Sequence, residues 1–169
     1  MTILKNQLIM IQLLSFDLTP SSVDSHWIYK KKKLNEAPKD MHGFVYMITN
    51  KETDRKYIGR KYLESARRVK VAGKKRRKIV KTPTNWKIYT GSSKPLNKDI
   101  EKLGKGKFKF EILVFGETKG QVNYLEENVH HRLHVVAREE YYNDCIGPRR
   151  FANVRLSEEV INKLNKVVK

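Results

Sequence analysis

Cysteine is almost absent from this sequence of 169 residues, in which Cys145 is the only example. A single thiol cannot form a disulfide within the chain, and it cannot supply the pairs of cysteines on which most structural zinc sites depend. The composition therefore excludes a small disulfide-stabilised scaffold, and it predicts a reducing, intracellular environment.

Acidic residues are also scarce. Asp and Glu number 18 against 36 Lys and Arg, which gives a formal net charge of +18 at pH 7. So strong a positive field attracts polyanions, and nucleic acid is the commonest polyanionic partner of a basic domain. An anionic membrane surface is the alternative, but binding to it usually requires a basic amphipathic helix with a broad apolar face.

Long hydrophobic runs are missing as well. The most apolar stretch, residues 1–14, is interrupted by Asn6, Gln7 and Gln12, and no small-residue cleavage site follows it. This stretch is too short and too polar to span a bilayer. We therefore expect a cytoplasmic protein that is not secreted and has no membrane partner.

Three regions are expected along the chain. They are an N-terminal extension or basic arm over residues 1–40, a folded domain over 41–147, and a C-terminal tail with a short helix over 148–169. The extension combines turn formers with four consecutive lysines, and we expect Trp27 and Tyr29 to dock on the folded domain. The lysine run is either a solvated stretch or an arm that contacts phosphates.

Two strands open the folded domain. Apolar and aromatic residues predict a strand over 44–48, and residues 56–59 predict a second one. The residues between them, 50–55, are polar and turn-forming. The pattern predicts an antiparallel hairpin, in which Gly59 either ends the second strand or lets a ligand approach the backbone.

A strongly basic segment follows the hairpin. Residues 60–87 contain 12 Lys and Arg, and Glu64 is their only acidic neighbour in the sequence. Gly73 lies in the middle of the segment, which favours a hairpin or a mobile loop there, and a short helix is a further alternative.

The remaining elements are helices and one more strand. Ser93 and Pro95 mark the start of a helix whose apolar stripe ends at Gly104. Alternating apolar residues predict a strand over 107–115, and a second apolar stripe predicts a helix over 122–133. This order predicts an α+β fold in which a small three-stranded antiparallel sheet is flanked by helices.

Five points of the sequence resemble a known nuclease family. Phe44–Tyr46, followed eleven positions later by Tyr57–Gly59, is similar to the paired signature of the GIY-YIG nucleases. Three single residues, Arg67, Glu126 and Asn143, stand where that family has a catalytic arginine on its first helix, a metal-binding glutamate on a later helix and an asparagine that closes the site.

The resemblance covers residues 42–146, and residues 89–108 look most like phage Seg-type homing endonucleases. It implies a homing-type DNA endonuclease that hydrolyses phosphodiester bonds of double-stranded DNA with Mg²⁺ or Mn²⁺. If a phage encodes the chain, the enzyme is expected in the cytoplasm of the host cell. The resemblance leaves it open whether the protein acts as a monomer or as a transient dimer on DNA.

The resemblance also implies a role for each site residue. Glu126 would hold the metal ion, because a hard carboxylate ligand suits Mg²⁺. Tyr46 would help to activate water as a general base if neighbouring cations lower its pKa, and Tyr57 would orient water or phosphate. Arg67 would bind the developing negative charge with its guanidinium, and Asn143 would fix the site by hydrogen bonding.

Other interpretations of these residues stay open. A tyrosine in a strand is often a packing residue, and Asn143 can equally end a turn. Arg68 competes with Arg67 for the catalytic role, and Glu127 competes with Glu126. Some members of the family have a histidine four residues after the arginine, where this chain has Val71. The role of that histidine would be filled by Tyr46, by a nearby lysine such as Lys61, or by no residue.

Basic residues around the hairpin are expected to bind DNA: Lys61, Arg68, Lys74, Lys75, Arg76, Arg77 and Lys78. A second function class is a catalytically inactive DNA- or RNA-binding protein that keeps the nuclease fold. His130 and His134 share a helical face and suggest zinc, but no third ligand is evident near them.

Overall fold

The computed structural model describes residues 24–73, 75–147 and 157–167. The predictions for residues 1–23 and for Lys74 lie outside the described residues. The architecture is α+β, as predicted, but its main sheet has five strands rather than three. No helix in the described ranges is both long enough and apolar enough to cross a membrane.

The main sheet has the strand order β2-β1-β7-β3-β4 and is antiparallel except where β1 meets β7. Its strands are β1 (Ile28–Tyr29), β2 (Lys32–Lys33), β3 (Gly43–Asn50), β4 (Lys56–Tyr62) and β7 (Phe108–Gly116). Because β4 stands at one end of this order, it is an edge strand, and its outer side is open to other parts of the chain.

The two additional strands come from the segment that was expected to be an arm. Ile28 of β1 pairs in parallel with Glu111, and β1 and β2 form a short hairpin across part of the lysine run. Trp27 is completely buried, and its indole Nε1 donates a hydrogen bond of 2.6 Å to the carbonyl oxygen of Trp86. The predicted docking of Trp27 is therefore confirmed, and residues 28–33 belong to the sheet.

The predicted β3–β4 hairpin is confirmed, with Tyr46 opposite Gly59. A β-bulge in the pairing of β3 with β7 lies between Val45 and Tyr46. Bulges are frequent beside active sites, where they change the direction of a side chain. Here the bulge sits at the tyrosine that the sequence places in the site.

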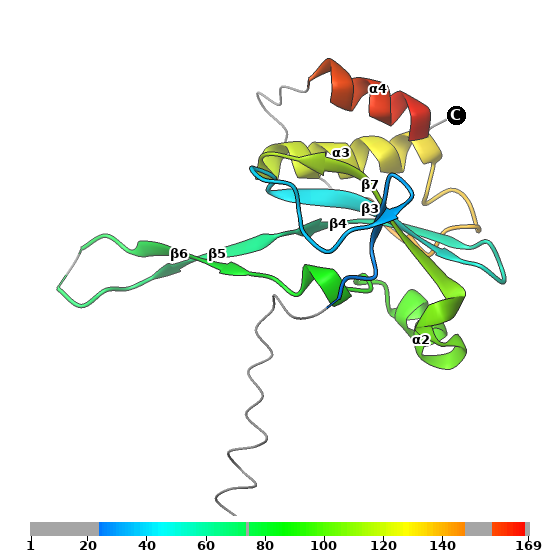
Figure 1. Ribbon diagram of the computed structural model, residues 1–169, viewed down its shortest axis with the longest axis horizontal. Helices are drawn as coiled ribbons and strands as arrows, with labels where there is room; N and C mark the ends of the chain where they lie inside the picture. Colours follow the sequence, from blue (N-terminus) through cyan, green and yellow to red (C-terminus); the bar gives the residue numbers. More distant parts are fainter. Residues whose placement is uncertain (1–23, 74, 148–156, 168–169) are drawn as a thin grey trace, which may run out of the picture.

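Helices cover the two faces of the sheet. Val45 and Ile58 point to the face covered by α3 (Lys119–Leu133), and α4 (Glu158–Val167) packs on the same side of the sheet against β7 (Figure 1). The other face packs against Trp27, Trp86 of the 3₁₀ helix η1 (Trp86–Ile88) and α2 (Lys94–Leu103). The predicted start and end of α2 are confirmed, because Ser93 accepts a hydrogen bond from the backbone amide of Leu96 and Gly104 has φ 84°. A second 3₁₀ helix, η2 (Lys105–Lys107), connects α2 to β7.

The basic segment forms a two-stranded ribbon. Strands β5 (Glu64–Val69) and β6 (Lys78–Pro83) pair antiparallel and extend away from the body of the protein (Figure 1). The hairpin that Gly73 indicated is therefore correct. The short helix considered for this segment, and the helix implied for Arg67 by the resemblance, are wrong, because Arg67 lies within β5.

Candidate active site

A cleft of about 980 Å³ lies along β4. It is bounded by the two strands of the β3–β4 hairpin, by α3, by the segment that leads into α2 and by residues 143–147. Four of the five side chains expected in the site line it, namely Tyr46, Tyr57, Glu126 and Asn143. The fifth, Arg67, does not line the cleft and is exposed on the ribbon.

Two tyrosines form one side of the cleft. Their rings lie on the same face of neighbouring strands, with 6.1 Å between the centroids of Tyr46 and Tyr57. Gly59 makes this arrangement possible, because a Cβ atom there would lie 2.6 Å from the Tyr46 hydroxyl oxygen and 3.0 Å from Cε1 of Tyr57. The glycine of the signature is thus needed for space between two aromatic rings, and a positive φ is not involved.

Burial determines the chemistry of these phenols. Tyr46 is 1% exposed, and this burial raises its pKa well above the usual value, while the opposing effect of nearby Arg60 is smaller. Burial also raises the pKa of Tyr57, whose hydroxyl lies 3.0 Å from Ser92 Oγ. The expectation that neighbouring cations lower the pKa of Tyr46 is therefore wrong, because desolvation outweighs them.

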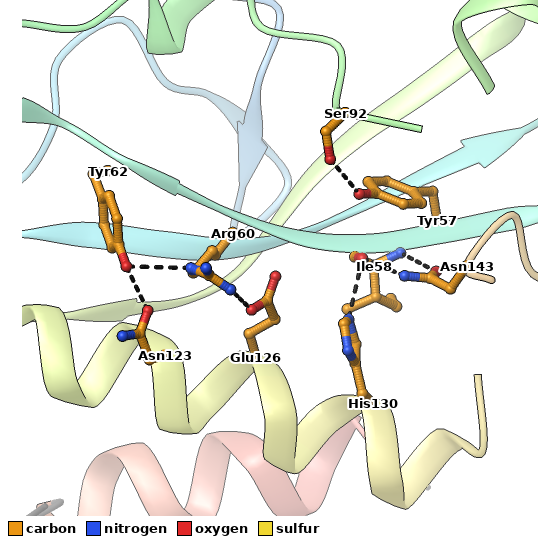
Figure 2. A network of polar contacts seen from close by, with 9 residues as sticks. All are labelled: Tyr57, Ile58, Arg60, Tyr62, Ser92, Asn123, Glu126, His130 and Asn143. Atoms are coloured by element: carbon orange, nitrogen blue, oxygen red, sulfur yellow. Dashed lines mark hydrogen bonds and ion pairs between the residues drawn. The ribbon is translucent and has the colours of Figure 1, made fainter. Parts of the chain in front are cut away.

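The other side of the cleft holds an ion pair that crosses from β4 to α3. Arg60 donates through Nη1 to Oε2 of Glu126, and both side chains are mostly buried, at 20% and 13% exposure (Figure 2). The Nε of Arg60 also donates to the Tyr62 hydroxyl at 3.2 Å, and that hydroxyl contacts Asn123 on α3. The carboxylate expected to bind a metal is thus held in place by an arginine on the edge strand.

Arg60 lines the cleft but is not among the site residues that the sequence analysis named. It directly follows Gly59, so it lies in the signature strand, and strand alternation places its side chain on the same face as Ile58, toward α3. That alternation was readable from the sequence, but the approach of Glu126, 66 positions later, depends on the packing of α3 against β4.

The backbone between the two sides is fixed by two further side chains. Asn143 accepts a hydrogen bond of 3.0 Å from the amide of Ile58 and donates one of 2.8 Å to its carbonyl oxygen (Figure 2). His130 Nε2 lies 3.2 Å from the same oxygen, and since a carbonyl only accepts, this nitrogen carries the proton. Burial lowers the pKa of His130, so the ring is neutral at pH 7. Asn143 and His130 therefore position β4.

The donor set fits a hydrated divalent ion. Glu126 offers a carboxylate, and the adjacent Glu127 also lines the cleft, with its buried Oε2 making no hydrogen bond within the described residues. Mg²⁺ keeps several waters and needs only one or two protein carboxylates. No group of three His, Cys, Asp or Glu residues that could enclose a metal is found in the described ranges.

The basic residues expected to bind DNA separate into two places. Lys61 lines the cleft, where Nζ stands 3.9 Å above the centre of the Tyr89 ring and burial lowers its pKa. The other described members are exposed on the ribbon or its connecting turn: Arg68, Lys75, Arg76, Arg77 and Lys78. Like Arg67, the rival Arg68 is not among the residues that line the cleft.

Comparison with known families gives one match. A family model described as "Putative endonuclease segE, GIY-YIG domain" matches residues 27–146. This range begins directly before β1 and ends within the residues that line the cleft, so it includes all the strands and both sides of the site. No curated protein matches the chain, and no solved structure matches it.

Proposed function

Because this chain belongs to the SegE-type GIY-YIG endonuclease domain family, we propose that it hydrolyses phosphodiester bonds of double-stranded DNA in the β4 cleft. One observation carries the proposal. The Arg60–Glu126 ion pair and the two signature tyrosines line the same cleft, so a cation, a carboxylate and two phenols surround one space that can hold a phosphate. Homing-type action and phage origin stay predictions.

Arg60 takes the role of the phosphate-binding arginine in this proposal. A guanidinium has five N–H donors in a planar fork, and the contacts of Arg60 within the described residues use two of them. The remaining donors can bind two oxygens of a phosphate at once and stabilise the charge that develops there. Glu126 holds the guanidinium in position for this contact.

The tyrosines act in their protonated form. Since the raised pKa of Tyr46 disfavours the phenolate, we assign this side chain the orientation of the attacking water through its hydroxyl rather than proton abstraction. Tyr57, fixed by Ser92, contributes a second hydroxyl on the same side. Mg²⁺ or Mn²⁺ held by Glu126, with Glu127 beside it, would neutralise charge on the phosphoryl oxygens and on the leaving 3′ oxygen.

Single-turnover cleavage of plasmid DNA at saturating protein tests the proposal. We expect cleavage in Mg²⁺ and none in EDTA, and a rate at least about 100-fold lower for Glu126→Gln and for Arg60→Gln. Glu101→Gln is the matched control, because this exposed glutamate on α2 lies outside the cleft lining and its loss removes the same charge. Circular dichroism of each variant separates loss of chemistry from loss of fold, and Glu126→Asp serves if the Gln variant does not fold.

The outcomes separate the alternatives. Undiminished cutting by Glu126→Gln would remove Glu126 from the site, and Glu127→Gln would then be expected to abolish cutting. A larger loss of rate for Arg67→Gln than for Arg60→Gln would return the catalytic role to Arg67. A wild-type protein that binds DNA but cuts none under any of these conditions would support the inactive binding protein instead.

A further inference from the structure

Most residues of the β5–β6 ribbon are exposed. It forms a separate two-stranded sheet that no third strand of the described chain joins, and every residue of β5 is exposed. Two large apolar side chains on it, Val69 and Ile79, are 41% and 58% exposed. An isolated two-stranded hairpin is only marginally stable in water, and large exposed apolar side chains often mark a binding surface. We therefore expect this ribbon to bind a partner molecule.

Both faces of the ribbon combine cations with apolar groups. Cross-strand pairing places Arg67 beside Val80 on one face and Arg68 beside Ile79 on the other. The only acidic residue of β5 and β6 is Glu64, which is paired with Lys81. The described cations of the ribbon and its turn are Arg67, Arg68, Lys70, Lys75, Arg76, Arg77, Lys78 and Lys81.

We propose that this ribbon inserts into the major groove of double-stranded DNA next to the cleft and reads base sequence there; the choice of DNA rests on the proposed function. The major groove of B-form DNA admits a two-stranded β-ribbon, in which arginine can bind guanine and an apolar side chain can contact the thymine methyl group. The A-form major groove of double-stranded RNA is too narrow for such an element.

The connection of the ribbon to the cleft sets its reach. Glu64, the first residue of β5, lines the cleft, so the ribbon starts at the site of chemistry. Ala72, at the turn, is eight residues further, which corresponds to about 26 Å of extended chain. At 3.4 Å per base pair, the turn reaches at most about eight base pairs beyond the edge of the cleft at Glu64.

Salt-dependent binding tests whether the ribbon contacts DNA. The probe is a 40-bp duplex selected from a randomised pool by the wild-type protein in EDTA, where no cleavage is expected. The ribbon variant replaces four arginines by glutamine, at Arg67, Arg68, Arg76 and Arg77. The control variant removes the same charge from exposed lysines outside the ribbon and the cleft lining, at Lys39, Lys98, Lys102 and Lys166.

We expect the slope of log K against log salt to fall by about two to four units for the ribbon variant, since each lost phosphate contact removes about 0.9. The control variant should lose less than about one unit. The wild type and the control variant should bind the selected duplex more tightly than a duplex of random sequence, and the ribbon variant should bind the two with equal affinity. Equal slopes for the two variants, or a wild-type pool without sequence preference, would overturn the proposal.

Tethered cleavage tests where the ribbon lies. Cys145 is the single thiol of the chain, is exposed and lines the cleft, so an iron chelate attached to it reports the position of the cleft on the selected duplex. Ala72→Cys in a Cys145→Ser background reports the position of the turn. We expect turn-derived strand breaks on one side of the cleft-derived breaks, displaced by no more than about eight base pairs.

Superimposed break patterns, or no breaks from Ala72→Cys, would overturn the placement of the ribbon. Equal competition by an RNA duplex of the same sequence would overturn insertion into the major groove. Failure of the nuclease proposal gives a different result. In that case the wild-type protein does not cleave plasmid DNA in Mg²⁺, but its DNA binding and the positions of the tethered breaks in EDTA are as expected.

Discussion

Gly59→Ala is the perturbation that most directly tests the packing of the two signature tyrosines. A Cβ at this position would lie 2.6 Å from the hydroxyl oxygen of Tyr46, 2.9 Å from its Cζ and 3.0 Å from Cε1 of Tyr57. All three distances are shorter than ordinary carbon contacts. Tyr46 is 1% exposed and Tyr57 is hydrogen-bonded to Ser92, so neither ring can move without disturbing its neighbours.

The expected magnitude follows from two opposing terms. Overpacking a well-filled core costs about 1–3 kcal/mol, and the two constrained rings place this site at the upper end. Replacing glycine by alanine within a strand returns about 0.5–1 kcal/mol through backbone entropy. We therefore expect a net loss of about 2 kcal/mol in the free energy of unfolding.

Chemical denaturation measures this loss, and Gly106→Ala is the matched control. A Cβ at Gly106 would meet no atom within 4 Å, so this variant should be as stable as the wild type or slightly more stable. Adding Tyr46→Phe to Gly59→Ala removes the closest of the three contacts and should restore part of the loss. Equal denaturation midpoints for Gly59→Ala and Gly106→Ala would refute the steric reasoning.

Two further predictions concern hydrogen bonding and pH. Asn143→Ala removes both hydrogen bonds to Ile58, so the free energy of unfolding should fall by about 1–3 kcal/mol and the Ile58 amide should exchange faster with solvent; an unchanged exchange rate would contradict a positioning role. Burial, with a smaller contribution from Lys105, lowers the pKa of His26 from 6.5 to about 4. Between these two pH values the unfolded chain binds a proton at His26 that the folded protein does not bind. The free energy of unfolding should therefore fall as the pH falls from 6.5 to 4. The partly exposed ring limits this contribution to about 1–2 kcal/mol, and His26→Phe should remove it from denaturation curves measured across that pH range, whereas parallel curves for the two proteins would show that His26 contributes nothing.

The elements with local signals were predictable from the sequence. The β3–β4 hairpin follows from two apolar runs across a polar turn, and α2 follows from Ser93 before it and Gly104 after it. These signals act within a few residues, so no tertiary contact has to be known. Strands β1 and β2 contain two residues each and give no periodicity, and the parallel pairing of Ile28 with Glu111 joins distant parts of the chain.

The position of Arg67 shows why spacing alone does not predict which arginine lines the cleft. Eight residues separate it from Gly59, which corresponds to about 12 Å along a helix but about 26 Å along a strand. The family pattern assumes a helix after the signature, whereas this chain continues from β4 into β5. The extended path carries Arg67 out of the cleft, and the position beside Glu126 is taken by Arg60.

The edge of the sheet connects the site to the ribbon. The first half of β4 is covered by residues 140–143, because the Lys56 amide donates to the carbonyl of Glu140, its carbonyl accepts from the Tyr142 amide and Asn143 binds the backbone of Ile58. This cover ends before Gly59, and Arg60, which follows it, lines the cleft. The same strand path then leaves the sheet as β5. One continuous segment is therefore anchored at its start, lines the cleft in its middle and projects as a basic ribbon at its end. The length of this segment would accordingly set the distance on the DNA between a phosphate bound at Arg60 and any base that the ribbon contacts.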